Sequence, residues 1–168
     1  YPVQGRPDAS SSVGIRAAEF LTIPVGARGI GMGGAAAAVL DDISAMWWNP
    51  AGLGLMNQKE MMLTVVDYTL DLTYSYAAFA APIADNVMTV GGFIGYLDIP
   101  DEEITTITAP NGTGNFYNAY DFQMGGSFAY NMSDRFVAGL NGKFIHQNFF
   151  QDLSGSAFGI DAGAIYHT

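Results

Sequence analysis

The sequence contains no cysteine and few charged residues. The absence of cysteine excludes a disulfide scaffold, cysteine-based zinc sites and thiol catalysis. Charged residues make up 13 % of the chain, against about 25 % in an ordinary soluble domain. Only 6 of the 168 residues are Lys or Arg, and the formal net charge is −10. Because nucleic-acid binding needs a basic surface, we exclude nucleic acid as a partner.

Long hydrophobic runs are also missing. No window holds about 20 consecutive apolar residues free of charge and glycine, so we do not expect a transmembrane helix. The closest candidate, residues 29–40, is too short and too rich in Gly and Ala. The sequence shows no signal peptide, but an exported protein would already have lost that segment, so this decides nothing about localisation.

Glycine, with 21 residues, and aromatic residues, at 13 %, are abundant, and the pattern divides the chain into three parts. Residues 1–15 are polar and are predicted to form a flexible leader. Residues 16–57 are rich in Gly and Ala and show little alternation, which predicts short helical turns and tight loops. Here Asp41 or Asp42 is expected to cap a short helix over 44–47 that Asn49-Pro50 ends. Residues 58–168 are predicted to form strands.

This third part alternates between apolar and polar side chains, the pattern of strands whose two faces meet different environments. We expect six strands, at about 60–67, 71–82, 86–98, 118–131, 135–147 and 156–166. In 118–131 one face carries Tyr120, Phe122, Met124, Phe128 and Tyr130, and the other carries Asp121, Gln123, Gly125, Ser127 and Asn131. Later strands place Arg135, Asn141, Lys143 and Asp161 on the polar face. The predicted fold class is all-β and antiparallel.

A soluble β-sandwich and a transmembrane β-barrel both alternate in this way. The lengths of the predicted strands favour the barrel, because a tilted membrane-spanning strand needs about 9–11 residues and most sandwich strands are shorter. Aromatic residues near the strand ends form two levels, as in interfacial girdles: Tyr68, Tyr74, Tyr96, Phe116, Tyr117, Tyr120, Phe149 and Phe150 at one, and Tyr130, Phe136 and Tyr166 at the other.

The lengths of the connections between the predicted strands also favour a transmembrane barrel. Tight turns are expected at 82–86 and 131–134, and a long link at 99–117 carries the acidic run Asp101, Glu102 and Glu103. Short turns on one side and longer loops on the other are typical of outer-membrane barrels. The sequence therefore predicts an antiparallel transmembrane β-barrel in the bacterial outer membrane, reached after removal of a signal peptide.

Six strands are fewer than the roughly eight with which single-chain barrels begin. In hydrocarbon every backbone N–H and C=O must be paired, so an open sheet edge is not tolerated there. We therefore expect a partial barrel. Either the sequence is a fragment, or another chain covers the edges of the sheet.

Residues 20–53 carry a resemblance to a known family. This stretch reads FLTIPVGARGIGMGGAAAAVLDDISAMWWNPAGL, with a GAR stretch at 26–28, a GMGGA stretch at 31–35, an acidic pair before Ser44 and a WNPAGL stretch at 48–53. It resembles the N-terminal signature of the PorV/PorQ family, within the FadL-like superfamily of outer-membrane barrels. Residues 156–166 also resemble a strand that is typical of this family.

The resemblance implies a larger barrel in which residues 16–57 form a plug or hatch. PorV-like members work in type IX secretion, where they partner a large translocon barrel and hand over secreted cargo. FadL-like members admit hydrophobic molecules through a lateral opening. A PorV-like export component is therefore the leading hypothesis, and a FadL-like uptake channel or a structural subunit of an envelope assembly are the alternatives. The lipid bilayer and lipopolysaccharide are the expected surroundings.

Arg28, Asp41 and Asp42 are the only concentrated charges in the predicted plug. They are interpreted either as a gating or ligand-contacting cluster or, more simply, as a structural salt bridge that holds the plug in place. The acidic pair and the arginine are candidate plug residues on both interpretations.

Trp47, Trp48 and Asn49 complete the set of candidate plug or gating residues. The two tryptophans either line a path for a hydrophobic ligand or anchor the segment against the barrel wall as bulky packing groups. Because two of these side chains are large and apolar, we expect the segment to lie against a surface.

The sequence holds no recognisable arrangement for catalysis, metal binding or a cofactor. His146 and His167 have no carboxylate at ligand-like spacing, and no G-x-S-x-G elbow is present. The glycines at 31–34 lack the lysine of a phosphate-binding loop. We therefore do not expect an enzyme, and we expect no metal and no cofactor.

Overall fold

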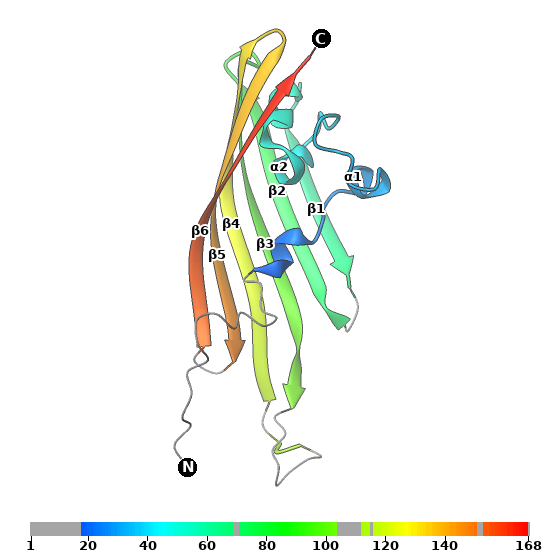
Figure 1. Ribbon diagram of the computed structural model, residues 1–168, viewed down its shortest axis with the longest axis vertical. Helices are drawn as coiled ribbons and strands as arrows, with labels where there is room; N and C mark the ends of the chain where they lie inside the picture. The colour runs from blue at the N-terminus through cyan, green and yellow to red at the C-terminus, as the bar shows by residue number, and fades with distance from the viewer. Residues whose placement is uncertain (1–17, 69–70, 104–111, 115, 151–152, 168) are drawn as a thin grey trace, which may run out of the picture.

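The computed structural model describes residues 18–68, 71–103, 112–114, 116–150 and 153–167. In these ranges a segment of short helical turns precedes six long strands (Figure 1). The strands are β1 (Glu60–Asp67), β2 (Thr73–Ile83), β3 (Met88–Glu103), β4 (Phe116–Ser133), β5 (Phe136–Phe150) and β6 (Leu153–Tyr166). The prediction of six strands in an all-β chain is confirmed. The predicted leader, residues 1–15, lies outside the described residues.

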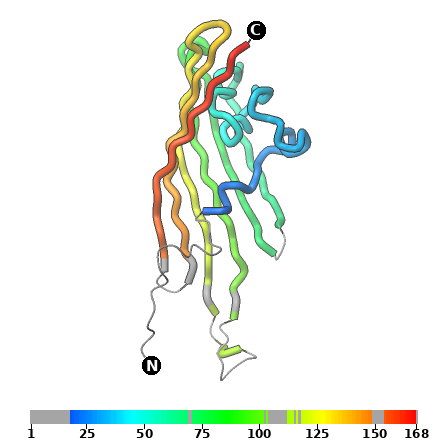
Figure 2. The backbone as a smooth tube through the Cα atoms, in the orientation of Figure 1, coloured from blue at the N-terminus to red at the C-terminus, as the bar shows by residue number. Residues whose placement is uncertain are grey.

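The six strands form one sheet in the order β1-β2-β3-β4-β5-β6, and every neighbouring pair is antiparallel. Figure 2 shows the strands running side by side along the long axis of the molecule. Among the described residues β1 pairs only with β2, and β6 only with β5, so the sheet is open. Its two edge strands therefore present unpaired backbone groups.

The predicted long acidic link at 99–117 is wrong at both ends. Strand β3 continues to Glu103 and β4 begins at Phe116, so the acidic residues from Asp101 belong to a strand. The β3–β4 register shifts between Ile99 and Glu102, beside Pro100. A bulge at proline lets the pairing resume beyond a residue that cannot donate a backbone hydrogen bond. The acidic character of the stretch does not prevent this pairing.

The tight turns at the opposite end of the sheet overlap the predicted ones at 82–86 and 131–134, but they begin two and three residues later, because β2 continues to Ile83 and β4 to Ser133. Residues 84–87 connect β2 to β3, and Ala84, Asp85 and Asn86 in this turn have a positive φ, between 51° and 66°. Residues 134–135 connect β4 to β5. Strand β6 begins earlier than predicted, at Leu153, so only residues 151–152 separate it from β5. The connections away from the tight turns are therefore not uniformly long.

The N-terminal segment, residues 18–57, lies on one face of the sheet, which we call the inner face (Figure 1). It contains η1 (Glu19–Thr22), α1 (Ala27–Gly31), α2 (Ala45–Trp48) and η2 (Pro50–Leu55). Helix α2 matches the predicted short helix. The N-cap residue of α2 is Ser44, with no side-chain capping bond, so the predicted cap by Asp41 or Asp42 is wrong, because the helix begins one residue later than predicted. Asp42 instead accepts hydrogen bonds from the backbone N–H of Ser44, at 2.8 Å, and from its hydroxyl, in the turn before α2. No described helix is long and apolar enough to cross a membrane.

The hydrophobic core lies between the N-terminal segment and the inner face of β2 and β3. Phe20, Leu40 and Met46 pack there against side chains of the two strands. Tyr74 is fully buried in this core, with its ring 6.4 Å from that of Phe20. Its predicted place in an outer aromatic level is therefore wrong, because the alternation of β2 turns Tyr74 toward the N-terminal segment.

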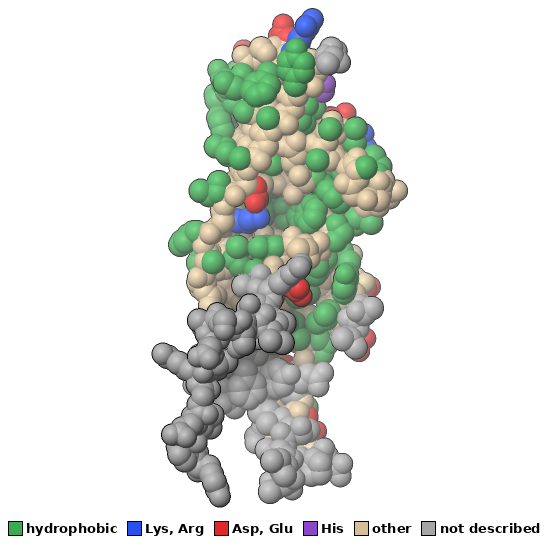
Figure 3. All heavy atoms as spheres, in the orientation of Figure 1, with side chains coloured by type: hydrophobic (Ala, Val, Ile, Leu, Met, Phe, Trp, Pro, Cys, Tyr) green, Lys and Arg blue, Asp and Glu red, His purple; other side chains and the backbone are tan. Residues whose placement is uncertain are grey.

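The two faces of β4 and β5 differ in an unusual way. On the inner face Asp121, Gln123 and Asn141 are buried, whereas Met124 and Leu140 on the outer face are about half exposed (51 % and 53 %). Soluble proteins follow the opposite arrangement, with polar groups outside. Figure 3 shows the side of the molecule that carries the N-terminal segment, where charged side chains are also few.

Candidate functional site

Asn49 attaches the N-terminal segment to the sheet. Its side-chain amide donates to the carbonyl oxygens of Ala37, at 2.7 Å, and Ala164, at 3.4 Å. Its side-chain oxygen accepts from the backbone N–H of Ala51 at 3.1 Å. One side chain thus closes the loop before α2, begins η2 and contacts β6. Of the predicted plug residues, Asn49 makes the most direct contact with the strands.

Glycines on β5 and β6 receive the segment that follows Asn49. A β-carbon on Gly163 would collide with the Asn49 side chain, and one on Gly139 would collide with the backbone of Pro50 and Ala51. The absence of side chains at these two positions lets the η2 backbone approach the sheet. The small residues in this part of the chain therefore serve close packing.

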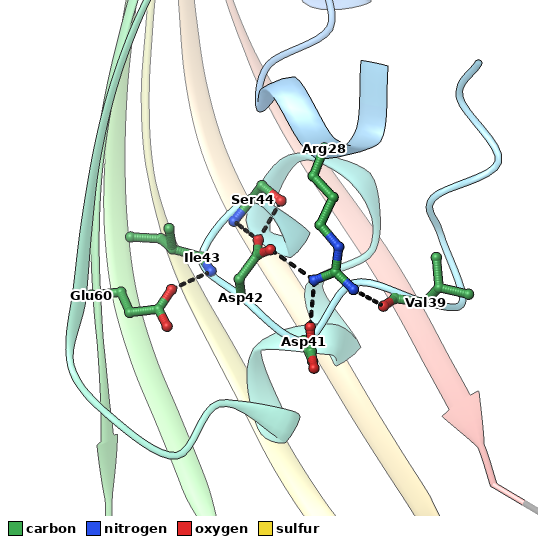
Figure 4. Close-up of polar contacts among 7 residues, drawn as sticks. All are labelled: Arg28, Val39, Asp41, Asp42, Ile43, Ser44 and Glu60. Atoms are coloured by element: carbon green, nitrogen blue, oxygen red, sulfur yellow. Dashed lines mark hydrogen bonds and ion pairs between the residues drawn. The ribbon is translucent and has the colours of Figure 1, made fainter. Parts of the chain in front are cut away.

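Arg28 pairs with both predicted acidic partners (Figure 4). Its Nη1 lies 2.6 Å from Asp41 Oδ1 and 3.1 Å from Asp42 Oδ2, and Nη2 donates to the carbonyl oxygen of Val39 at 3.4 Å. Asp42 also accepts hydrogen bonds from Ser44, the N-cap residue of α2, so the arginine connects α1 to the start of α2. The three residues form an ion-paired clamp, which closes the loop between the two helices.

The clamp is exposed to solvent. The Arg28 and Asp41 side chains are 51 % and 60 % exposed. Hydrogen bonding to Arg28 holds the pKa of Asp41 below its ordinary value, and hydrogen bonding to Asp41 raises the pKa of Arg28. Exposed ion pairs contribute little to stability, so the clamp is suited to a contact that can open.

Trp47 and Trp48 contact each other with ring centroids 4.6 Å apart. Trp48 donates from its indole N–H to the carbonyl oxygen of Val25 at 3.0 Å, and a β-carbon on Gly29 would lie 2.5 Å from that nitrogen. Trp48 thus anchors α1 onto α2. The sequence leaves anchoring and ligand contact as alternatives for this pair. The geometry shows the anchoring contact of Trp48, and both rings also line a cleft, so ligand contact stays a prediction.

The cleft lies between the N-terminal segment and the inner face of the sheet and has a volume of about 480 Å³. This is within the range of about 300–1,000 Å³ that is usual for ligand sites. Its hydrophobic lining includes Trp47, Trp48, Tyr76 and Phe93, and its polar lining consists of Asn49, Gln123, Asn141, Lys143 and Asp161. Of the predicted site residues, the two tryptophans and Asn49 line the cleft. The residues of the Arg28 clamp do not line it.

The polar side of the cleft is held by an ion pair between strands. Lys143 Nζ lies 2.9 Å from Asp161 Oδ2. Asn141 donates from Nδ2 to the carbonyl oxygen of Met46 at 2.8 Å and to Asp161 at 3.3 Å. These contacts join β5, β6 and α2 at one point. In the described part of the chain, Asn141 Oδ1 is buried and has no hydrogen-bond partner.

The sequence assigns Asn141, Lys143 and Asp161 to the polar face but does not bring them to the tryptophans. Alternation predicts the face of each residue, and the β5–β6 pairing places Asn141 opposite Asp161. The contact with Met46 depends on how a non-repetitive segment folds back, for which the sequence carries no periodic signal. Among the described residues, no group of three His, Asp or Glu side chains is placed to hold a metal ion.

A comparison with models of known protein families and a search of curated proteins both find no match to this chain. The resemblance of residues 20–53 to the PorV/PorQ signature therefore remains a prediction from the motif. Function has to be inferred from the geometry of the sheet, the N-terminal segment and the cleft.

Proposed function

We propose that this chain forms part of the wall of an outer-membrane β-barrel, with residues 18–57 as a plug on its lumen side. The observation that supports this most is the inverted polarity of β4 and β5, with polar residues buried and apolar residues exposed. In a lipid bilayer this arrangement is favourable, because the exposed face meets hydrocarbon and the inner face meets a polar lumen.

The height of the apolar outer face fits a membrane. On β4 the outer-facing positions from Tyr120 to Met132 carry no charged side chain. At about 3.3 Å per residue this stretch is about 40 Å long, and a tilt of about 40° reduces it to about 30 Å along the barrel axis. The apolar band of outer-membrane barrels is about 25 Å tall. Tyr96 and Tyr120, which stack at 5.8 Å, lie at one end of this stretch.

The open edges imply further strands in the working assembly. Strands β1 and β6 each have one edge without a partner among the described residues. A hydrocarbon environment requires all backbone groups to be paired, so these edges have to be covered by strands of a complete barrel. We therefore propose that the six-stranded sheet works as one arc of a larger barrel.

Within this barrel we propose a PorV-like role as an export component. Two features support it: the motif in residues 20–53, and a segment seated on β5 and β6 through Asn49, Gly139 and Gly163. A segment held in this way closes the lumen side and suits an accessory barrel that presents a surface to partners. A FadL-like uptake channel has weaker support, because the cleft carries Lys143 and Asp161 among its lining residues.

The membrane location is tested by cell fractionation together with heat-modifiable mobility on gels. The protein is expected in the outer-membrane fraction, and unboiled samples are expected to migrate differently from boiled ones. Recovery in a soluble fraction as a stable, monodisperse protein would overturn the barrel proposal. Fractionation and gel mobility do not depend on any partner protein, so they test the barrel proposal separately from the export proposal.

The export role is tested by affinity isolation from outer membranes solubilised in mild detergent. A large translocon barrel or cargo with a C-terminal signal is expected to be recovered with the tagged protein. A matched variant, Trp48→Ala, removes the anchor of α1 and is expected to reduce recovery if the plug presents the binding surface. Recovery of neither partner, while a control envelope complex survives, contradicts the export role and leaves a structural or uptake role.

A further inference from the structure

The cleft between the N-terminal segment and the sheet combines two kinds of surface. Flat apolar rings are supplied by Trp47, Trp48 and Tyr76, and hydrogen-bonding groups by the side chains of β4, β5 and β6. Tyr76 and Phe93 lie in the wall with their rings 5.9 Å apart. A ligand for this site needs both an apolar surface and several polar groups around it.

The charges of the cleft point to a neutral ligand. Among the described residues that line the cleft, Lys143 and Asp161 are the only charged ones, and they neutralise each other at 2.9 Å. A fatty acyl chain offers no hydrogen-bonding group to the charged and amide side chains that line the cleft, which is unfavourable for the polar atoms that it would cover. A charged ligand would have to compete with the ion pair for one of its members. A neutral molecule with several hydroxyl groups meets neither obstacle.

The charged side chains that line the cleft have hydrogen-bonding capacity left over, which hydroxyl groups of a ligand can use. The side chain of Asp161 is about 40 % exposed, and one of its carboxylate oxygens has no contact with another described residue. Lys143 can donate two further hydrogen bonds beyond its bond to Asp161. The side-chain oxygen of Asn141 is buried and is not accessible from the cleft, so the ligand contacts of this wall are left to Lys143 and Asp161. Hydroxyl groups donate and accept, so they can bond to both of these side chains.

We propose that this cleft binds a neutral saccharide, with a sugar ring placed against the tryptophans and its hydroxyl groups on Lys143 and Asp161. The C–H face of a sugar ring is apolar and packs on an aromatic ring, while the hydroxyl groups at its edge form hydrogen bonds. The volume of about 480 Å³ is suited to one or two sugar units, and the remaining unit of a trisaccharide such as maltotriose would extend out of the cleft. Saccharide binding does not require the export role, since it uses only the cleft.

The chain provides a built-in probe for this site. It contains 2 tryptophans, and both line the cleft. Intrinsic tryptophan fluorescence therefore reports on the cleft alone. The full chain is purified in a detergent without a sugar headgroup, because glucoside and maltoside detergents would compete. Maltotriose is then titrated, and sodium laurate serves as the acyl-chain comparison.

Maltotriose is expected to shift the fluorescence saturably, and laurate to have no saturable effect. Asp161→Ala is expected to weaken maltotriose binding by roughly tenfold or more, because a hydrogen bond to a charged group is lost. Asn148→Ala, on β5 but on the outer face, is the matched control and should bind as the unchanged protein does. Circular dichroism and gel mobility check that each variant is folded.

Two further ligands test whether the bound sugar is free in solution or is the headgroup of a glycolipid. Methyl glucoside represents a free sugar, and octyl glucoside below its micellar concentration represents a glycolipid headgroup. Equal affinity for both supports recognition of the sugar alone, and tighter binding of octyl glucoside supports a glycolipid as its source. The proposal is overturned if maltotriose gives no saturable shift, if laurate alone binds, or if Asp161→Ala binds maltotriose unchanged.

Discussion

The side chain of Asn49 occupies the space above Gly163 in which any other residue would place its β-carbon. The two residues are 114 positions apart in sequence, and the hydrogen bond from Asn49 to the carbonyl oxygen of Ala164 lies beside them. The end of α2 is therefore fitted to one position on β6. A single methyl group added at Gly163 would therefore disturb the packing of the N-terminal segment on the sheet.

Gly163→Ala is expected to destabilise the protein by about 1–3 kcal/mol, because a methyl group forced into a packed interface displaces its neighbours. Gly155 is the matched control, since it is on the same strand and face and has open space within 4 Å of the point where a β-carbon would lie. Gly155→Ala is expected to leave stability unchanged or raise it slightly. The free energy of unfolding in urea is the measurement, and equal values for the two variants would refute the close fit.

Asn49→Ala is expected to lower the free energy of unfolding by about 1–3 kcal/mol, because three backbone groups lose the polar atom that satisfies them. Asn118 is the matched control, since among the described residues its side chain makes one exposed hydrogen bond, to Asp101 at 2.9 Å. Asn118→Ala is expected to change stability by less than about 0.5 kcal/mol. Limited proteolysis of residues 26–44 gives a second readout, and unchanged protection in Asn49→Ala would contradict the role of Asn49.

The strands could be predicted because alternation is a local signal. Tyr120 through Tyr130 show both faces of β4 within one stretch, and the pairing order follows from short connections. The prediction failed where the local signal is misleading. Asp101 and its acidic neighbours resemble a loop, yet β3 continues there, because backbone pairing with β4 does not depend on apolar side chains.

The candidate site could be predicted only in part. Charge alone brought Arg28 together with Asp41 and Asp42, since few other partners exist nearby in sequence. The cleft could not be predicted, because it is formed where Met46 meets Asn141 across 95 positions. Such a contact depends on how an aperiodic segment folds onto the sheet, and the glycines that allow it look like loop residues in the sequence.

The Arg28 clamp is expected to open in acid. Because the pKa of Asp41 is lowered in the folded protein, the contact stabilises the clamp above the unfolded carboxyl pKa of about 3.9 and is lost as the pH falls through the lower folded value. The chain has no cysteine, so a spin label at Ala38→Cys is the only label on the protein. Its mobility is expected to stay constant from neutral pH to about pH 5 and to rise below about pH 4.

Asp41→Asn provides the comparison for this pH dependence. The label is expected to be more mobile than in the parent protein at neutral pH, with a smaller further change in acid, because only Asp42 still pairs with Arg28. A label at Asn148→Cys on β5 shows whether the sheet itself changes in acid. Identical pH profiles with and without Asp41→Asn would mean that the clamp does not depend on this carboxylate.

Met124→Arg tests which face of the sheet meets lipid. Met124 is on the outer face of β4, within the apolar stretch, and is 51 % exposed. In a bilayer, an arginine at mid-depth on the lipid face is expected to cost about 2–4 kcal/mol of folding free energy. Ala157→Arg is the matched control, because Ala157 is exposed on the inner face of β6, opposite Ile145. A polar lumen should accept this arginine with little change.

Folding into lipid vesicles, followed by denaturant titration, measures both variants against the parent protein. We expect Met124→Arg to lose much folding free energy relative to the parent protein and Ala157→Arg to lose little. The same pair in detergent micelles should differ less, since a micelle deforms around a charge more easily than a bilayer does. If Ala157→Arg lost more folding free energy in vesicles than Met124→Arg, the inner face would be the one that meets lipid. This would contradict the barrel orientation, in which buried polar residues such as Gln123 face a polar lumen.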